Sequence, residues 1–174
     1  QDYGILSPIH LNWEGRNLEH YFSKFASNTP DFYSDFILEK EIKSVYEAPF
    51  VNAACWLLNR NILETVGGFD PVFFHYGEDN NYCQRARYHG FKIGIVSSCF
   101  IEHDSVVRYS KSEELFSGNY YRDALNKLKI NLCDINKAIN KSDYNSVRKH
   151  IFRLIILNLF KSNFKNVLGY FKKY

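Results

Sequence analysis

Residues 52–100 alternate between short apolar runs and one helical pattern, and this alternation limits the folds that the chain can adopt. Apolar runs span 52–59 and 91–100, and between them residues 78–89 place apolar side chains at helical spacing. Gly90 directly follows that pattern, where a glycine commonly ends a helix. Strands that alternate with helices are typical of an α/β fold, so we expect a sheet with flanking helices.

The segments before this region are less informative. The apolar opening at 3–9 contains Ser7-Pro8, which predicts a buried strand that runs into a loop. Residues 10–50 show few periodic signals and include loop-forming residues such as Asn-Thr-Pro. A short helix is predicted at 60–66, ended by two glycines. In all, about three strands are visible, which is few for a complete sheet.

The C-terminal third has a different character. Residues 112–139 are rich in helical patterns with one or two breaks, and 147–174 form a long helical pattern. We therefore divide the chain into an α/β region at 1–110 and a helical region at 111–174.

Composition excludes several classes of protein. The 174 residues are 45% hydrophobic and 17% aromatic, which is too apolar for a disordered chain. A net charge of +3 does not indicate a dedicated nucleic-acid-binding protein, and we expect no nucleic-acid partner. No run reaches the roughly 18 apolar residues of a membrane-spanning helix. The four cysteines form no C-x-x-C pair, so we interpret them as reduced and expect a cytoplasmic protein.

The distribution of charge is uneven. Residues 141–174 contain eight Lys and Arg and one acid, so this tail carries +7 and residues 1–140 carry −4. On one continuous helix, the apolar residues from Phe152 to Phe171 would share a face and Lys165 would lie off it. Such a pattern is typical of a helix on an anionic membrane surface. It fits equally well a helix packed against its own domain, and both interpretations stay open.

Two adjacent acids, Glu78 and Asp79, follow an aromatic loop and open the helical pattern at 78–89. Acids in this position commonly stabilise a helix start through its free amide groups. A carboxylate held beneath aromatic walls can also act as a general base. The spacing alone does not decide between the two roles.

His103 lies just beyond the strand predicted at 91–100 and next to Asp104. Ligand sites in open α/β sheets concentrate at the carboxyl ends of strands, and a neutral imidazole can bind a divalent metal. An ordinary histidine at a sheet edge, with a simple hydrogen bond, is the alternative.

The order of these segments resembles the second half of the inverting family 2 glycosyltransferases, particularly their rhamnosyltransferase-like members. The matching segments are NAACWLL at 52–58, VGGFDPVFFHYGED at 66–79, YCQRAR at 82–87, GFKI at 90–93 and, after the strand, His103. The resemblance covers about residues 3–104 and is most specific near 66–92. It implies a partial sheet of the GT-A type, and a function in polysaccharide biosynthesis.

The resemblance also implies roles for individual residues. Asp79 would be the catalytic base that deprotonates an acceptor hydroxyl, and Glu78 would position the acceptor or orient the base. Trp56 and Tyr76 would line the acceptor site, although core packing is an equal alternative for Trp56. His103 would help to hold a divalent cation, Mg or Mn, on the diphosphate of the donor. The implied partners are a nucleotide-sugar donor and a glycan or lipid-linked glycan acceptor.

The sequence departs from the family in one respect. In that family a nucleotide-binding half that ends in an Asp-x-Asp motif precedes this region, and the sequence contains no Asp-x-Asp triplet. We therefore expect the chain to be the acceptor-side portion of a longer enzyme and to be inactive by itself. We also expect it to be a peripheral protein on the inner face of the cytoplasmic membrane. The alternative is a non-catalytic module that binds carbohydrate or docks on a membrane.

Overall fold

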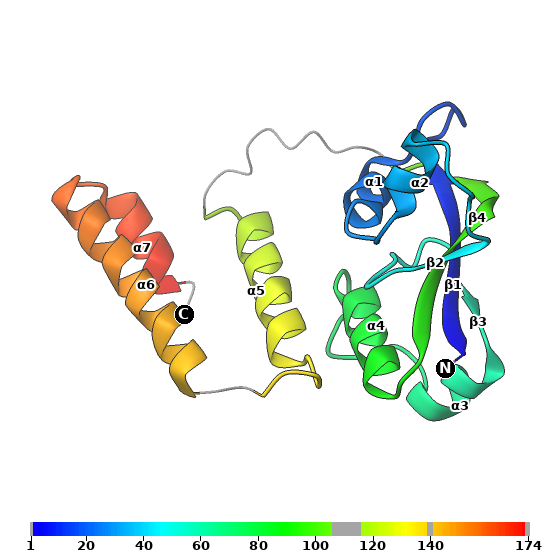
Figure 1. The fold of residues 1–174 in the computed structure, drawn as a ribbon. Helices are drawn as coiled ribbons and strands as arrows, with labels where there is room; N and C mark the ends of the chain where they lie inside the picture. Colours follow the sequence, from blue (N-terminus) through cyan, green and yellow to red (C-terminus); the bar gives the residue numbers. More distant parts are fainter. Residues whose placement is uncertain (1, 106–115, 139–140, 173–174) are drawn as a thin grey trace. The chain divides into compact units, whose positions relative to one another are not determined.

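The computed structural model contains two compact units, each with its own secondary structure (Figure 1). It describes residues 2–105, 116–138 and 141–172. The first unit comprises Gln1–Arg108 and Asp134–Asn136 and holds the sheet. The second comprises Tyr109–Cys133 and Lys137–Tyr174 and is helical in its described part. The predicted α/β class with a helical C-terminal region is confirmed.

The sheet of the first unit is mixed, with strand order β2-β4-β1-β3. Its two long strands, β1 (Tyr3–Leu11) and β4 (Lys92–Glu102), run parallel to each other. Each long strand also pairs with one short antiparallel strand: β2 (Val45–Glu47) borders β4 and β3 (Leu57–Leu58) borders β1. The carboxyl ends of β1 and β4 therefore meet at one edge of the sheet.

Strand β1 is longer than the sequence predicts. It continues through Ser7-Pro8 to Leu11 and does not end in a loop there. Proline has no amide hydrogen, so it disrupts a strand only where that hydrogen would be bonded. Strand β3 pairs only with Ile5 and Leu6, which leaves that side of β1 open at Pro8, and the register with β4 shifts between Pro8 and Ile9. An open edge and a bulge accommodate the proline.

The described part of the first unit contains four helices: α1 (His20–Ala26), α2 (Phe32–Ile37), α3 (Arg60–Val66) and α4 (Glu78–Tyr88). Helices α3 and α4 agree with the predictions at 60–66 and 78–89. Helices α1 and α2 were not predicted, because six or seven residues are too few to establish helical periodicity. The start of α2 is also unusual, since Asp31 is left-handed and makes no capping bond through its side chain.

The apolar run at 52–59 is mostly not a strand. Residues 53–55 form a turn, and only Leu57–Leu58 pair with the sheet. The core of the first unit lies between the sheet and its helices, and its fully buried side chains include Ile5, Phe22, Tyr46, Tyr82 and Ile93.

The second unit contains α5 (Gly118–Leu132), α6 (Lys141–Phe160) and α7 (Phe164–Lys172). The single long helix expected at 147–174 is wrong, because the chain turns between α6 and α7, where Ser162 is left-handed with φ 52°. The two helices form a hairpin, and among its described side chains Ile151 and Ile155 of α6 and Val167 of α7 form a buried apolar cluster. The apolar face expected on one continuous helix is therefore divided between two packed helices.

Aromatic contacts join the start of α5 to α7. The ring of Phe116 lies 5.0 Å from that of Tyr170, centroid to centroid, and the Tyr121 hydroxyl donates to the carbonyl oxygen of Gly169 at 3.0 Å. A Cβ atom at Gly169 would collide with the Phe116 ring, so only glycine permits this close packing.

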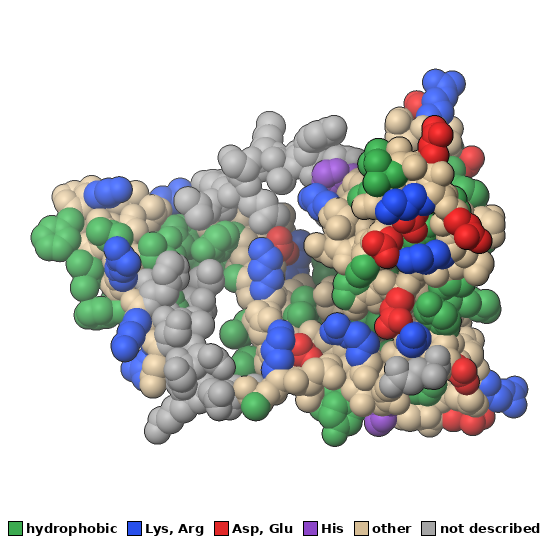
Figure 2. Space-filling model, viewed as in Figure 1, with side chains coloured by type: hydrophobic (Ala, Val, Ile, Leu, Met, Phe, Trp, Pro, Cys, Tyr) green, Lys and Arg blue, Asp and Glu red, His purple; other side chains and the backbone are tan. Residues whose placement is uncertain are grey.

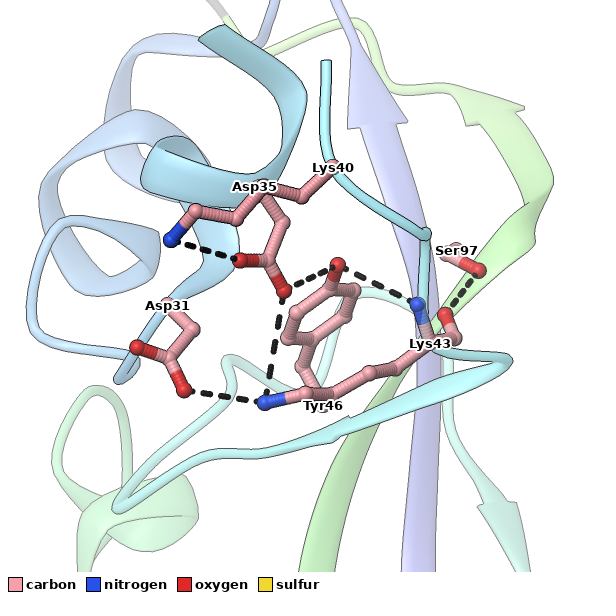
Figure 3. Close-up of polar contacts among 6 residues, drawn as sticks. All are labelled: Asp31, Asp35, Lys40, Lys43, Tyr46 and Ser97. Carbon is pink, nitrogen blue, oxygen red and sulfur yellow. Dashed lines mark hydrogen bonds and ion pairs between the residues drawn. The ribbon is translucent and has the colours of Figure 1, made fainter. Parts of the chain in front are cut away.

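A polar network anchors α2 to the segment that leads into β2 (Figure 3). Asp35 is buried and accepts a hydrogen bond from the Tyr46 hydroxyl at 3.1 Å. Lys40 and Lys43 approach the same carboxylate at 3.8 and 4.0 Å, and Lys43 also pairs with the exposed Asp31 at 2.9 Å. The Ser97 hydroxyl donates to the Lys43 carbonyl oxygen at 2.7 Å, so the network reaches β4.

Candidate active site

Tyr76 and Gly77, the two residues directly before α4, both have a left-handed backbone conformation. Tyr76 has φ 67° and Gly77 has φ 97°. Glycine adopts this conformation freely, but a tyrosine there is strained, and backbone strain of this kind gathers at functional sites. Gly77 is the N-cap of α4, so Glu78 and Asp79 lie in the first turn of the helix and neither is its capping residue.

The Asp79 carboxylate is partly buried and held by three donors. It accepts the backbone amide of Asn80 at 2.7 Å and the Asn80 side-chain amide at 3.1 Å, and the backbone amide of Ala53 also donates to it. Burial raises the pKa of Asp79 and the charge of Glu78 adds to the rise, while the bonds from Asn80 and Ala53 oppose it. The net pKa lies above the ordinary value, which makes this carboxylate a better proton acceptor than a solvated one.

Glu78 is partly buried, and its Oε2 atom is shielded from solvent without a hydrogen-bond partner. An unpaired buried carboxylate oxygen costs free energy unless a ligand or solvent group approaches it. The two carboxylates thus differ. Asp79 is held by hydrogen bonds from the protein, whereas Glu78 keeps one oxygen without a hydrogen-bond donor.

The loop before α4 exposes aromatic side chains. Phe74 is 97% exposed and Tyr76 is 47% exposed, and the rings of His75 and Tyr76 lie 4.0 Å apart. Aromatic faces of this kind pack against the C–H groups of sugars. Tyr76, one of the predicted acceptor residues, is therefore accessible and lies two residues before Glu78 in sequence.

Trp56, the other predicted acceptor residue, is partly buried. Its ring lies 6.0 Å from that of Phe69 and 5.6 Å from that of Tyr82, and it packs against the core of the first unit. Its indole Nε1 is buried without a hydrogen-bond partner. The packing agrees with a structural role and the free donor agrees with a ligand-binding role, so both interpretations of Trp56 stay open.

Arg85 fixes the Gly-Gly loop against α4. Its guanidinium donates to the carbonyl oxygens of Val66 at 2.8 Å and Gly68 at 2.6 Å, and to the Asn81 side chain at 3.0 Å. It also lies over the ring of Tyr82, 5.2 Å from the centroid. One arginine thus ties the end of α3 to the helix that carries the acid pair.

His103 lies where predicted, just beyond β4. Its backbone amide donates to the Leu11 carbonyl oxygen at 2.9 Å, which continues the pairing with β1. Its ring Nδ1 is buried without a partner. Across the strand ends, the ring of His10 lies 5.9 Å from that of His103, edge to face.

His10 and Glu19 belong to the surroundings of His103 and were missed in the sequence. His10 is fully buried, and its Nε2 lies 3.1 Å from the Ser7 hydroxyl. Burial and the neighbouring His103 lower the pKa of His10 to about 4, against an opposing effect of Glu19. The signal that could have identified His10 is its position in the sheet. His103 follows the end of β4, His10 lies near the end of β1, and these two strands are parallel neighbours.

Glu19 ties the segment after β4 to α1. It is buried, and its Oε2 accepts the Phe22 amide at 2.7 Å as the N-cap of α1, while Oε1 accepts the Ser105 hydroxyl. Burial alone would raise the pKa of Glu19, but the bonds from Ser105, Tyr21 and Phe22 outweigh it and hold the pKa below its usual range.

The predicted site residues therefore form two groups. Asp79, Glu78 and Tyr76 lie at the start of α4, and Asp79 also bonds to Ala53, three residues before Trp56. His103 forms a separate group with His10 and Glu19 at the strand ends, and within the described residues no hydrogen bond or ring contact joins it to Asp79.

The predicted divalent cation fits this structure poorly. The unpartnered Nδ1 of His103 supplies one nitrogen donor, but the described residues contain no group of three or more His, Cys, Asp or Glu side chains arranged to hold a metal. Mg²⁺ and Mn²⁺ prefer several oxygen ligands, so one imidazole does not make a site. The metal stays a prediction, and no step below depends on it.

Comparison with known proteins places the chain near one class of enzyme, the glycosyltransferases, as a distant homologue. The matched protein is the low-salt glycan biosynthesis hexosyltransferase Agl10 of Haloferax volcanii, to which the chain is 26% identical over 155 residues. The match covers 84% of this chain and 47% of the relative, so the chain spans about half the length of that protein. No family model and no solved structure matches the chain.

Within the described residues, no helix combines the length and the apolar character that crossing a membrane requires.

Proposed function

We propose that this chain is the acceptor-side half of an inverting glycosyltransferase of family 2, with a GT-A type sheet in its first unit. Two findings support the proposal: the distant homology to a hexosyltransferase and the mixed sheet with α4 packed beside it. The reaction would move a sugar from a nucleotide-sugar to a hydroxyl of a glycan or lipid-linked glycan.

The environment of Asp79 carries the proposal. Inversion needs an acceptor hydroxyl that loses its proton as its oxygen attacks the anomeric carbon from the face opposite the leaving diphosphate. Asp79 is fixed in place by Asn80 and Ala53, and burial raises its pKa. In the proposed reaction its carboxylate takes that proton as the diphosphate leaves.

Neighbouring residues would orient the acceptor. The free Oε2 atom of Glu78 can accept a hydrogen bond from a second sugar hydroxyl. The exposed ring of Tyr76 offers a surface for the sugar C–H groups, and the unpaired indole N–H of Trp56 can donate to a sugar oxygen. Arg85 would act indirectly, because it holds the loop that leads to these residues.

We place the donor diphosphate near His103, whose unpartnered ring nitrogen lies at the strand ends beside His10. A divalent cation, when present, would supply charge to stabilise the departing diphosphate. In this proposal its remaining ligands come from beyond the described residues of the chain.

The test is a transfer assay with the intact protein, a panel of nucleoside-diphosphate hexoses and glycan acceptors. The proposal predicts a glycosylated product whose new linkage has the anomeric configuration opposite to that of the donor. If the protein binds glycans but neither transfers sugar nor releases nucleotide from any donor, the alternative of a non-catalytic carbohydrate-binding module is correct.

A further inference from the structure

The hairpin of α6 and α7 buries few apolar residues and leaves a larger set uncovered. Among the side chains that the structure describes, its apolar interior consists of Ile151, Ile155 and Val167, with Tyr170 packed against them. Five other large apolar side chains are each more than 60% exposed: Phe152, Phe160, Phe164, Leu168 and Phe171. Exposed apolar surface on this scale is unusual for a protein in water and commonly marks an interaction site. We call these five residues the apolar set.

The positions of the apolar set follow the helices. Phe164, Leu168 and Phe171 have the spacing i, i+4, i+7, so they form one stripe along α7. Phe160 and Phe164 flank the turn between the helices, and Phe160 is 84% exposed. Val167, a buried residue of α7, adjoins this stripe, since it lies three residues after Phe164 and four before Phe171. The hairpin therefore buries one edge of the apolar face of α7, at Val167, and leaves the stripe exposed.

Basic side chains accompany the apolar set. The described exposed cations of the two helices are Arg148, Lys149, Arg153, Lys161, Lys165 and Lys172. The sequence contains no Asp or Glu from residue 144 to residue 174. Figure 2 shows hydrophobic and Lys or Arg side chains side by side on the visible surface of α6 and α7. Phenylalanine next to lysine, without acids, is the composition of a surface that binds an anionic interface.

We propose that the α6–α7 hairpin docks on an anionic lipid bilayer, with the apolar set in the acyl boundary and the lysines and arginines among the headgroups. Charge complementarity selects this partner. A second copy of the chain would bring like charges together, because Asp143 is the single acid of each hairpin against its several lysines and arginines, and this opposes association. The proposal does not depend on glycosyl transfer, because it rests on the second unit alone.

Co-sedimentation of the full chain with vesicles tests the proposal. We expect binding to phosphatidylcholine vesicles that contain phosphatidylglycerol, and little binding to phosphatidylcholine alone. The combined variant Lys161→Gln, Lys165→Gln and Lys172→Gln should bind about a hundredfold less at low salt, since each cation near the surface contributes on the order of a fivefold factor. High salt should reduce the difference between this variant and the unmodified chain.

The apolar set is tested separately by Phe164→Ser, Leu168→Ser and Phe171→Ser in one chain. We expect binding to fall at least about tenfold at either salt concentration. The matched control is Ile37→Ser with Leu57→Ser, two residues of the first unit that are 74% and 69% exposed. The control should bind like the unmodified chain, and circular dichroism should show unchanged helix content in all variants.

Three results would overturn the proposal. Equal binding of the serine variant and its control would show that the apolar set does not enter the bilayer. Equal binding to neutral and anionic vesicles would exclude the charge contribution. Sedimentation equilibrium that shows a dimer abolished by the serine variant, without vesicle binding, would identify a second copy of the chain as the occupant of this surface.

Discussion

At the scale of single residues, Asp79 shows how one carboxylate can be both well held and poorly solvated. Three hydrogen-bond donors fix it, yet burial outweighs them and, with a smaller contribution from the charge of Glu78, raises its pKa. A carboxyl group with a raised folded-state pKa is destabilising when ionised, because the folded protein then holds a charge that the unfolded chain solvates better. Sites for proton transfer commonly combine these properties.

This balance gives a prediction about stability. Asp79 favours folding below its unfolded-state pKa, and this contribution is lost as the pH rises through the raised folded-state pKa. Asp79→Asn should therefore be at least as stable as the unmodified chain at pH 7, with the difference shrinking in acid. Urea denaturation at several pH values measures it, and Glu64→Gln, at an exposed position of α3, is the control. A loss of more than about 1 kcal/mol at pH 7 would instead indicate a structural role at the helix start.

The sequence predicted the positions of the acid pair and of His103 but not the surroundings of either. Order and spacing in one segment place Glu78 and Asp79 at a helix start, which α4 confirms. His10 and Glu19 could not be recognised, because their proximity to His103 depends on pairing between β1 and β4, which are about 90 residues apart in sequence. The roles of all these residues remain predictions.

At the scale of elements, short pieces of secondary structure depend on contacts that sequence patterns do not contain. Helix α3 was predictable, because Asn59 caps it through a bond to the Ile62 amide and Gly67 ends it. Helix α2 has neither a side-chain cap nor enough residues for a periodic pattern, and a buried polar network positions it. Its stability thus comes from tertiary contacts more than from its own sequence.

The network at α2 can be tested by removing one carboxylate at a time. Asp35→Ala leaves the buried Tyr46 hydroxyl without its acceptor, so the free energy of unfolding should fall by about 1–3 kcal/mol. Asp31→Ala removes an exposed partner of Lys43 and should change stability little. Equal effects of the two substitutions in urea denaturation would show that burial of Asp35 does not determine its contribution.

The buried His10, near the end of β1, gives a prediction about how stability depends on pH. The pKa of His10 is about 4 in the folded protein and about 6.5 unfolded, so the unfolded chain gains protons first as the pH falls. Neutral His10 makes its full contribution to the free energy of unfolding above pH 6.5. This contribution is lost as the pH falls toward 4. Between pH 7 and pH 5 we expect a loss of about 2 kcal/mol. His10→Gln should reduce this pH dependence, and an unchanged slope would contradict the assignment.

At the scale of the whole molecule, the chain has two units of different character. The first carries the candidate active site on a mixed sheet, and the second carries a basic helical hairpin. The sequence predicted an α/β part and a helical part, but it did not predict the turn between α6 and α7. The helical spacing of apolar residues continues from Phe160 to Phe164, and only the packing of Ile151 and Ile155 against Val167 shows that there are two helices. The division of function between donor and acceptor halves remains a proposal.

That proposal predicts weak donor binding by the 174-residue chain. It contains no Asp-x-Asp triplet, and His103 alone supplies too few ligands for a metal–diphosphate complex. Isothermal titration with uridine and thymidine diphosphate-sugars in the presence of Mn²⁺ should give no saturable heat at micromolar concentrations. Micromolar affinity would mean that this chain contains a complete donor site.

The most direct test of the central claim is the transfer rate of Asp79→Asn in the intact protein. Loss of the base should reduce kcat by about 10²–10⁴-fold. Glu78→Gln should mainly raise KM for the acceptor, and the exposed Glu64→Gln should leave both constants unchanged. The acidic limb of the pH–rate profile should lie above the usual aspartate range, as the raised pKa of Asp79 requires. A kcat for Asp79→Asn within a few-fold of the unmodified enzyme would contradict the assignment of Asp79 as the catalytic base.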